Sequence, residues 1–118
     1  MSKPTIEKAG EIVPGEVLVG GVSFADRLNS GETITGTPTA AVTQLSGATD
    51  ADGIATSAVA ANSASVTIDG NTVATGEGVL FTVTSQSNAA RGAKYQILVT
   101  ATTTEDQTLK ERVTVVIL

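Results

Sequence analysis

The stretch Lys94–Leu118, KYQILVTATTTEDQTLKERVTVVIL, decides the fold. Its first half alternates apolar and polar residues, and one face collects Tyr95, Ile97, Val99 and Ala101. After a polar loop, Thr103–Thr108, the alternation resumes in the same phase with Leu109, Val113, Val115 and Ile117. A period of two is typical of a strand with one buried face. Two such strands around a short polar turn predict a β-hairpin with one buried side.

The rest of the chain continues as short strands separated by turn residues. We expect a first strand over 16–22, where Val17 and Val19 alternate, and further strands over 32–42, 54–61, 65–68, 72–74 and 79–84. Pro38 predicts an edge position or a bulge, because proline cannot donate to a ladder. Asp69-Gly70-Asn71 predicts a hairpin turn. Ser23–Leu28 predicts one or two helical turns that Ser23 caps and Gly31 ends.

These patterns predict an all-β fold, an immunoglobulin-like β-sandwich of about seven to eight strands over residues 16–118. An extended N-terminal arm, residues 1–15, precedes it and is broken by Pro4 and Pro14. Because the arm carries few apolar side chains, it needs contacts with the domain's own edge or with a partner to be ordered. On the partner interpretation, deleting Met1–Val13 leaves the melting temperature nearly unchanged but abolishes incorporation into an assembly.

Composition excludes several classes of function. Aromatic residues make up 3% of the 118 residues, so Val, Ile, Leu and Ala must fill the core. A net charge of −5 repels phosphate backbones, and seven scattered Lys and Arg cannot form a groove for nucleic acid. No apolar run has the length of a membrane span. The N-terminus lacks the apolar core of a signal peptide, so we expect synthesis in the cytoplasm.

The sequence also offers little for catalysis. Histidine and cysteine are absent, which removes the commonest general base, the thiolate nucleophile and nearly every zinc site. Several acids lie in predicted turns, where they are ordinary solubilising residues: Asp50, Asp52, Asp69, Glu105 and Asp106. No lysine sits in an SxxK-like setting that could activate a hydroxyl. We therefore predict a non-enzyme with no catalytic, cofactor-binding or metal-binding residues.

Two local features have alternative interpretations. Thr49–Gly53 (TDADG) resembles the opening of a calcium loop, since Asp50 and Asp52 alternate before a glycine. The later ligands are missing, so a DG turn between strands is the favoured interpretation. Tyr95, near the start of the penultimate strand, is either a tyrosine that ties a corner through its hydroxyl or an ordinary half-buried aromatic.

The order of short motifs resembles a known group of proteins. The motifs are Phe24 with Leu28-Asn29-Ser30-Gly31-Glu32-Thr33-Ile34, then Gly92-Ala93-Lys94-Tyr95, Val99–Thr103 and Arg112–Val115. Together they resemble the small immunoglobulin-like proteins of tailed bacteriophages, of the fibre–tail adaptor or neck-associated type. The chain departs from that pattern in lacking tryptophan in the opening segment. The resemblance implies a structural virion protein with no catalytic residues to carry over.

The leading hypothesis is therefore an adaptor at the neck or tail of a virion, which bridges larger virion proteins in a symmetric multi-copy assembly. A capsid decoration protein on the head lattice is an alternative. The number of copies per particle would distinguish it from the adaptor hypothesis. An immunoglobulin-like carbohydrate- or surface-binding module is the alternative from another class. Such modules display exposed aromatic side chains for stacking on sugar rings. Binding to nucleic acid or membrane is not expected.

Overall fold

The computed structural model describes residues 5–6, 10–47, 53–68 and 70–118, and it confirms an all-β sandwich. The elements are β1 (Thr5–Ile6), β2 (Gly10–Ile12), β3 (Val17–Ser23), the 3₁₀ turn η1 (Ala25–Arg27), β4 (Ile34–Ser46), β5 (Ile54–Ala61), β6 (Val66–Ile68), β7 (Asn71–Val73), β8 (Gly78–Ser85), β9 (Lys94–Thr103) and β10 (Thr108–Ile117). Within the described residues, no helix has the length and apolar character needed to span a membrane.

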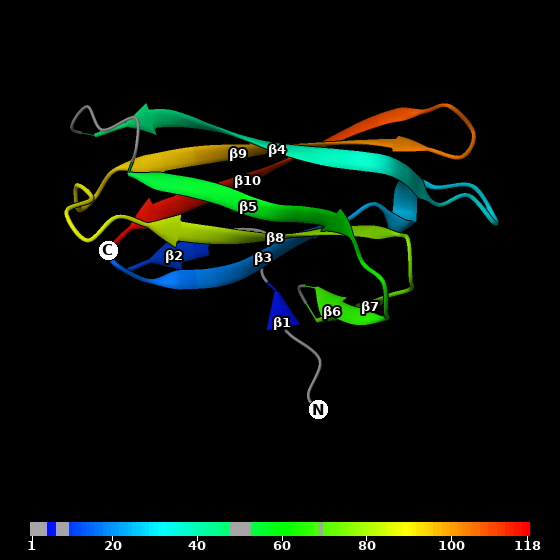
Figure 1. Ribbon diagram of the computed structural model, residues 1–118, viewed down its shortest axis with the longest axis horizontal. Helices are drawn as coiled ribbons and strands as arrows, with labels where there is room; N and C mark the ends of the chain where they lie inside the picture. The colour runs from blue at the N-terminus through cyan, green and yellow to red at the C-terminus, as the bar shows by residue number, and fades with distance from the viewer. Residues whose placement is uncertain (1–4, 7–9, 48–52, 69) are drawn as a thin grey trace.

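Two sheets form the sandwich, and a third, smaller sheet lies beside them (Figure 1). One layer has the strand order β2-β10-β9-β4 and the other β3-β8-β5. The small sheet, β1-β6-β7, includes the predicted hairpin and buries Val66, Ile68 and Val73 against Leu80 on the outer face of β8. The strand order is compatible with an immunoglobulin-like arrangement. That finer assignment stays a prediction.

The hairpin β9–β10 forms the centre of the larger layer. Its antiparallel register places Tyr95 opposite Val115 and Ile97 opposite Val113. The predicted inward face is confirmed, because all eight of its side chains are buried: Tyr95, Ile97, Val99, Ala101, Leu109, Val113, Val115 and Ile117. They pack against the buried residues of the facing layer, Val22, Ile54, Val79, Phe81 and Val83.

The edges β4 and β5 close one side of the sandwich. Thr56 Oγ1 of β5 donates to the carbonyl oxygen of Ala40 in β4 across 2.7 Å. The register of β4 shifts between Thr35 and Thr39, on either side of Pro38, as the sequence predicts for a proline at an edge. The register of β5 also shifts, at Ser57–Ala60. Both edges at this side are therefore irregular.

The N-terminal arm requires a correction. Gly10–Ile12, inside the predicted arm of residues 1–15, form β2, which pairs in parallel with Val115–Ile117 of β10. Ile12 is only 1% exposed and belongs to the main core. Val13–Glu16 then turn the chain into β3 through Pro14 and Gly15, whose φ is +87°. The sandwich therefore includes β2, because this short strand forms backbone hydrogen bonds with β10 and buries the side chain of Ile12.

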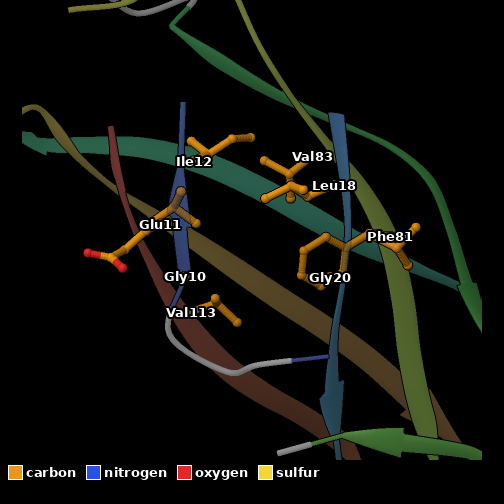
Figure 2. Close-up of a pocket in the computed structure, with 10 residues that line it drawn as sticks. Gly10, Glu11, Ile12, Leu18, Gly20, Phe81, Val83 and Val113 are labelled. Atoms are coloured by element: carbon orange, nitrogen blue, oxygen red, sulfur yellow. The ribbon is translucent and has the colours of Figure 1, made fainter. Parts of the chain in front are cut away.

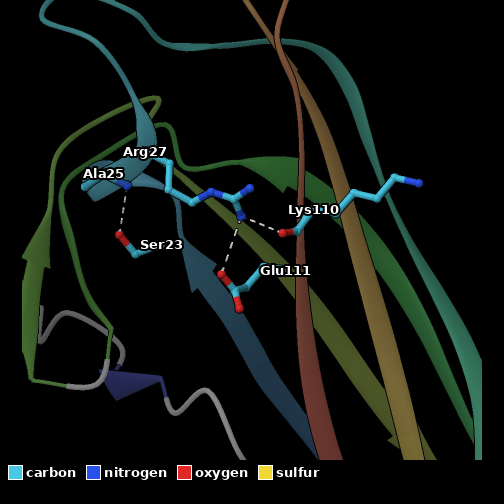
Figure 3. Close-up of polar contacts among 5 residues, drawn as sticks. All are labelled: Ser23, Ala25, Arg27, Lys110 and Glu111. Carbon is cyan, nitrogen blue, oxygen red and sulfur yellow. Dashed lines mark hydrogen bonds and ion pairs between the residues drawn. The ribbon is translucent and has the colours of Figure 1, made fainter.

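The predicted helical segment is a single 3₁₀ turn that ends at Arg27, earlier than the predicted stop at Gly31. Ser23 Oγ accepts a hydrogen bond from the N–H of Ala25 at 3.2 Å. Arg27 reaches β10, where its Nη1 donates to the carbonyl oxygen of Lys110 at 2.6 Å and lies 3.8 Å from a carboxylate oxygen of Glu111 (Figure 3). These contacts fix the turn against the hairpin.

Asn62 connects the end of β5 to the strands that follow it. Its side chain is buried, and its Nδ2 donates to the carbonyl oxygens of Ala64, Val73 and Ala74. Its Oδ1 accepts hydrogen bonds from the N–H groups of Gly76 and Gly78. One amide thus satisfies five backbone groups where β7 leads into β8.

Candidate functional site

An apolar groove of about 390 Å³ lies on the side of the sandwich opposite β4 and β5. It separates β2, the edge of one layer, from β3, the edge of the other (Figure 2). Four strands line it with Gly10, Glu11, Ile12, Leu18, Val19, Gly20, Phe81, Val83, Val113 and Val115. The carboxylate of Glu11 points away from the groove (Figure 2). The lining is therefore mostly the apolar interior of the sandwich, reached through the gap between two edges.

Exposed apolar side chains gather beside this groove. Of the six large hydrophobic residues exposed in the described part of the chain, four lie on β3 or the turn before it: Val13 (44% exposed), Val17 (60%), Leu18 (38%) and Val19 (54%). We call these four residues the seam cluster. A contiguous group of exposed apolar side chains on a soluble domain marks a contact surface more often than isolated ones do. The seam cluster is the candidate functional site.

The backbone pairing explains why these valines point outward. In β3, Leu18 lies opposite Val83 and Gly20 opposite Phe81, whose side chains face the core. Val17 and Val19 therefore occupy the outer face. Gly20 is required on the inner face, because a Cβ there would lie 2.8 Å from Cε2 of Phe81. The sequence pattern identified the strand but did not show that its two alternating valines are the solvent-facing ones.

The outer-face rows around Val17 and Val19 carry no charge, whereas the exposed Glu16 borders the seam cluster, where its Oε1 accepts a hydrogen bond from the N–H of Val13 at 2.8 Å. Val17 and Val19 stand in rows with the β8 and β5 residues Thr84, Ala55, Thr82 and Ser57. On the opposite layer, the exposed face carries Lys94, Lys110 and Arg112. The acidic chain therefore presents one neutral sheet face next to its apolar groove.

The buried carboxylate of Glu32 lies at the turn between β9 and β10. Glu32 is 1% exposed, and its Oε1 accepts hydrogen bonds from the N–H of Asn29 and from Gln107 Nε2, each at 2.8 Å. Thr103 Oγ1 donates to Oε2 of Glu32 and accepts from the N–H groups of Glu105 and Gln107. The hydrogen bonds from Thr103 and from the Asn29 backbone lower the pKa of Glu32 below its ordinary value of 4.5, against the opposing effect of burial. The ionised carboxylate is fully engaged in joining this turn to the segment before β4.

Glu32→Gln should destabilise the domain at neutral pH, because one amide oxygen replaces two acceptor oxygens. A lowered folded pKa stabilises the protein above the unfolded value of 4.5, and this contribution is lost as pH falls through the folded pKa. The stability difference between wild type and variant should therefore be largest at neutral pH and shrink below pH 4.5. Urea titrations across this range measure it. Glu11→Gln, which removes the same charge from an exposed position on β2, is the control for the loss of one negative charge.

The predicted turn acids do not form a site in the described residues. Glu105 and Asp106 lie in the β9–β10 turn, as expected, and Glu105 Oε1 accepts a hydrogen bond from Asn29 Nδ2 at 3.1 Å. Asp50, Asp52 and Asp69 lie outside the described residues, so the calcium interpretation of Thr49–Gly53 stays untested. No cluster of three or more acidic residues that could hold a metal occurs in the described segments.

All three aromatic side chains of the chain are in the core. Phe24 and Tyr95 are 0% exposed and Phe81 is 2% exposed. The interpretation of Tyr95 as half-buried is wrong, since it is fully enclosed. None of the three rings can stack on a sugar from the surface.

Comparison with known proteins gives little to place beside this geometry. No protein-family model matches the chain, and no curated protein matches it. Among solved structures, a family 123 glycoside hydrolase from Clostridium perfringens, described for glycolipid glycan hydrolysis, aligns with a TM-score of 0.47 at 11% identity. The alignment covers 97% of this chain and 23% of that enzyme. A likeness this low carries no argument about activity.

Proposed function

We propose that this chain is a non-enzymatic structural protein of a tailed-bacteriophage virion, docked at the neck or tail as an adaptor between larger virion proteins. The observation that carries the docking function is the seam cluster with the groove behind it. Burying exposed apolar surface against a partner is the main favourable term in protein association. The virion setting is supported by the motif resemblance described above, with its aromatic, Gly-Glu-Thr-Ile and Gly…Tyr segments.

The architecture also supports binding over catalysis. The one buried carboxylate in the described part of the chain, Glu32, accepts hydrogen bonds from three donors and stabilises a turn. The carbohydrate-binding alternative relies on exposed aromatic rings. Since Phe24, Phe81 and Tyr95 are all buried, this alternative has no support in the structure.

The proposal predicts that changing the seam cluster abolishes incorporation into particles. Val17→Lys/Val19→Lys places two charges on exposed positions, so the domain should still fold. Ala41→Lys/Thr43→Lys is the matched control, because it adds the same charges two residues apart on the exposed face of β4. We expect the first variant to be lost from purified virions and the control to be retained, as measured by quantitative mass spectrometry.

The same measurement gives the copy number. About six or twelve copies per particle indicate a neck or tail ring with cyclic symmetry, whereas about a hundred or more indicate decoration of the head. If both variants are incorporated as well as wild type, the seam cluster is not the docking surface. Absence of the wild-type chain from the particles would overturn the virion proposal.

A further inference from the structure

We infer that β3 pairs edge to edge with β3 of a second copy of this chain, which joins two sandwiches through one continuous sheet. The inference rests on the proposed function in that it uses the seam cluster, and it deepens that function by adding a second copy of this chain as a partner at the seam. It starts from the state of the sheet edges, because an unpaired strand presents a row of backbone donors and acceptors to any matching strand.

Among the four edges of the sandwich in the described residues, β3 is the longest one that is both uncharged and regular, and the two-residue strand β1 lies near it. It has seven residues, VLVGGVS, without a charge or a proline, and it pairs with β8 over its whole length without a register shift. The other edges of the sandwich carry features that prevent further pairing. β4 and β5 contain register shifts, and β2 has only three residues, one of them Glu11. Bulges, charges and short length are common ways of blocking an edge.

Charge argues that the strand on this edge is another β3. The chain has a net charge of −5, so two copies repel each other except where both surfaces are neutral. The outer face of β3, β8 and β5 beside the seam is such a surface. A two-fold axis requires a patch that complements itself. An uncharged, regular strand that pairs in the antiparallel direction meets this requirement.

The register follows from the alternation of side chains. Residues that lie opposite each other in an antiparallel pair point to the same side of the sheet. In a pair of identical strands, the two-fold axis must therefore pass through a residue that lies opposite itself, and not between two residues. If the axis passes through Leu18, Val17 of each copy lies opposite Val19 of the other. The two resulting valine pairs both lie on the outer face. Leu18 then meets its own counterpart at the groove. The two Glu16 residues stand four positions apart, about 13 Å, which exceeds the Debye length of about 8–10 Å.

Sedimentation velocity of the full chain at about 1 μM to 1 mM, where weak sheet-edge contacts associate, tests the inference. We expect a concentration-dependent dimer for wild type. Val17→Lys/Val19→Lys places lysines opposite lysines and should raise the dimer dissociation constant at least about tenfold. Ala41→Lys/Thr43→Lys, with the same change in net charge, should dimerise like wild type. Equal weakening by both variants, or a monomer throughout for wild type, overturns the inference.

A second measurement tests the register. The chain has no cysteine, so Leu18→Cys introduces a single thiol at the predicted axis. Paired residues have Cα atoms about 4.5–5.5 Å apart, within the range that a disulfide bridges. Under mild oxidation Leu18→Cys should form a covalent dimer faster than Thr43→Cys, the exposed control on β4. Equal rates for the two variants contradict the register.

The two proposals can fail separately. A wild-type chain that is monomeric, but whose seam variant is lost from virions, refutes pairing through β3 and leaves docking of another protein at the seam in place. A wild-type chain that dimerises through β3, but whose seam variant is still incorporated, supports the pairing and refutes the seam as the virion docking surface.

Discussion

Replacing Ile97 with alanine should destabilise the domain by about 2–5 kcal/mol, whereas replacing its neighbour Leu98 should cost at most about 1 kcal/mol. Ile97 lies opposite Val113 on the inner face of the hairpin and is 0% exposed. Leu98 lies opposite Arg112 on the outer face and is only partly buried. The two substituted positions are adjacent in β9, so comparing them isolates the effect of facing the core.

Urea unfolding measures this difference as a shift of the transition midpoint at constant slope. A loss of 3 kcal/mol should also lower the melting temperature by about 12 °C in a domain of this size. Comparable effects of the two substitutions would mean that the hairpin does not bury one face, and the packing of the two layers would need revision.

Deleting Met1–Val13 should lower the melting temperature by about 10 °C or more, because it removes a strand of the sandwich. The deletion takes away the ladder between β2 and β10 and the side chain of Ile12, which alone is worth about 2–5 kcal/mol. It also removes the carbonyl oxygen of Val13, which accepts a hydrogen bond from Ser85 Oγ at 2.6 Å. This expected result replaces the one drawn from the sequence, in which the melting temperature was unchanged.

Deletion of residues 1–9 is the control for this experiment, because it leaves β2 in place. We expect thermal unfolding, followed by circular dichroism, to separate the two truncations clearly. Ile12→Ala in the full chain should reproduce most of the loss. If the longer truncation melts within a few degrees of the shorter one, β2 contributes little and residues 1–13 behave as the dispensable arm that the sequence suggests.

The hairpin could be predicted from the sequence because its signal is local. In Lys94–Leu118 the apolar residues of the buried face lie at alternate positions, with polar residues at most of the positions between them, and a polar loop of six residues or fewer reverses the chain. Short strands elsewhere were located by the same rule. Pro38 marked an irregular edge correctly, because a missing N–H has the same consequence in any sheet.

The features that the sequence could not supply depend on distant partners. β2 is too short for periodicity, and its strand partner begins about a hundred residues later. In Val17–Val22 apolar residues occur on both faces, so only the pairing with β8 decides that Val17 and Val19 face solvent. Glu32 was assigned only to the start of the predicted strand 32–42, because its donors Thr103 and Gln107 lie 71 and 75 residues away in the chain. The sequence did not show the seam cluster, because apolar residues on both faces of β3 conceal which side chains face solvent.

The parallel ladder between β2 and β10 has a consequence for the timing of folding. It joins Gly10–Ile12 to Val115–Ile117, which follow about a hundred residues later in the chain. During synthesis the larger sheet therefore cannot be completed until Val115–Ile117 have emerged from the ribosome. Contacts between distant residues also slow folding, because the entropy of closing the loop is lost before the contact forms. We therefore expect refolding on the scale of milliseconds to seconds.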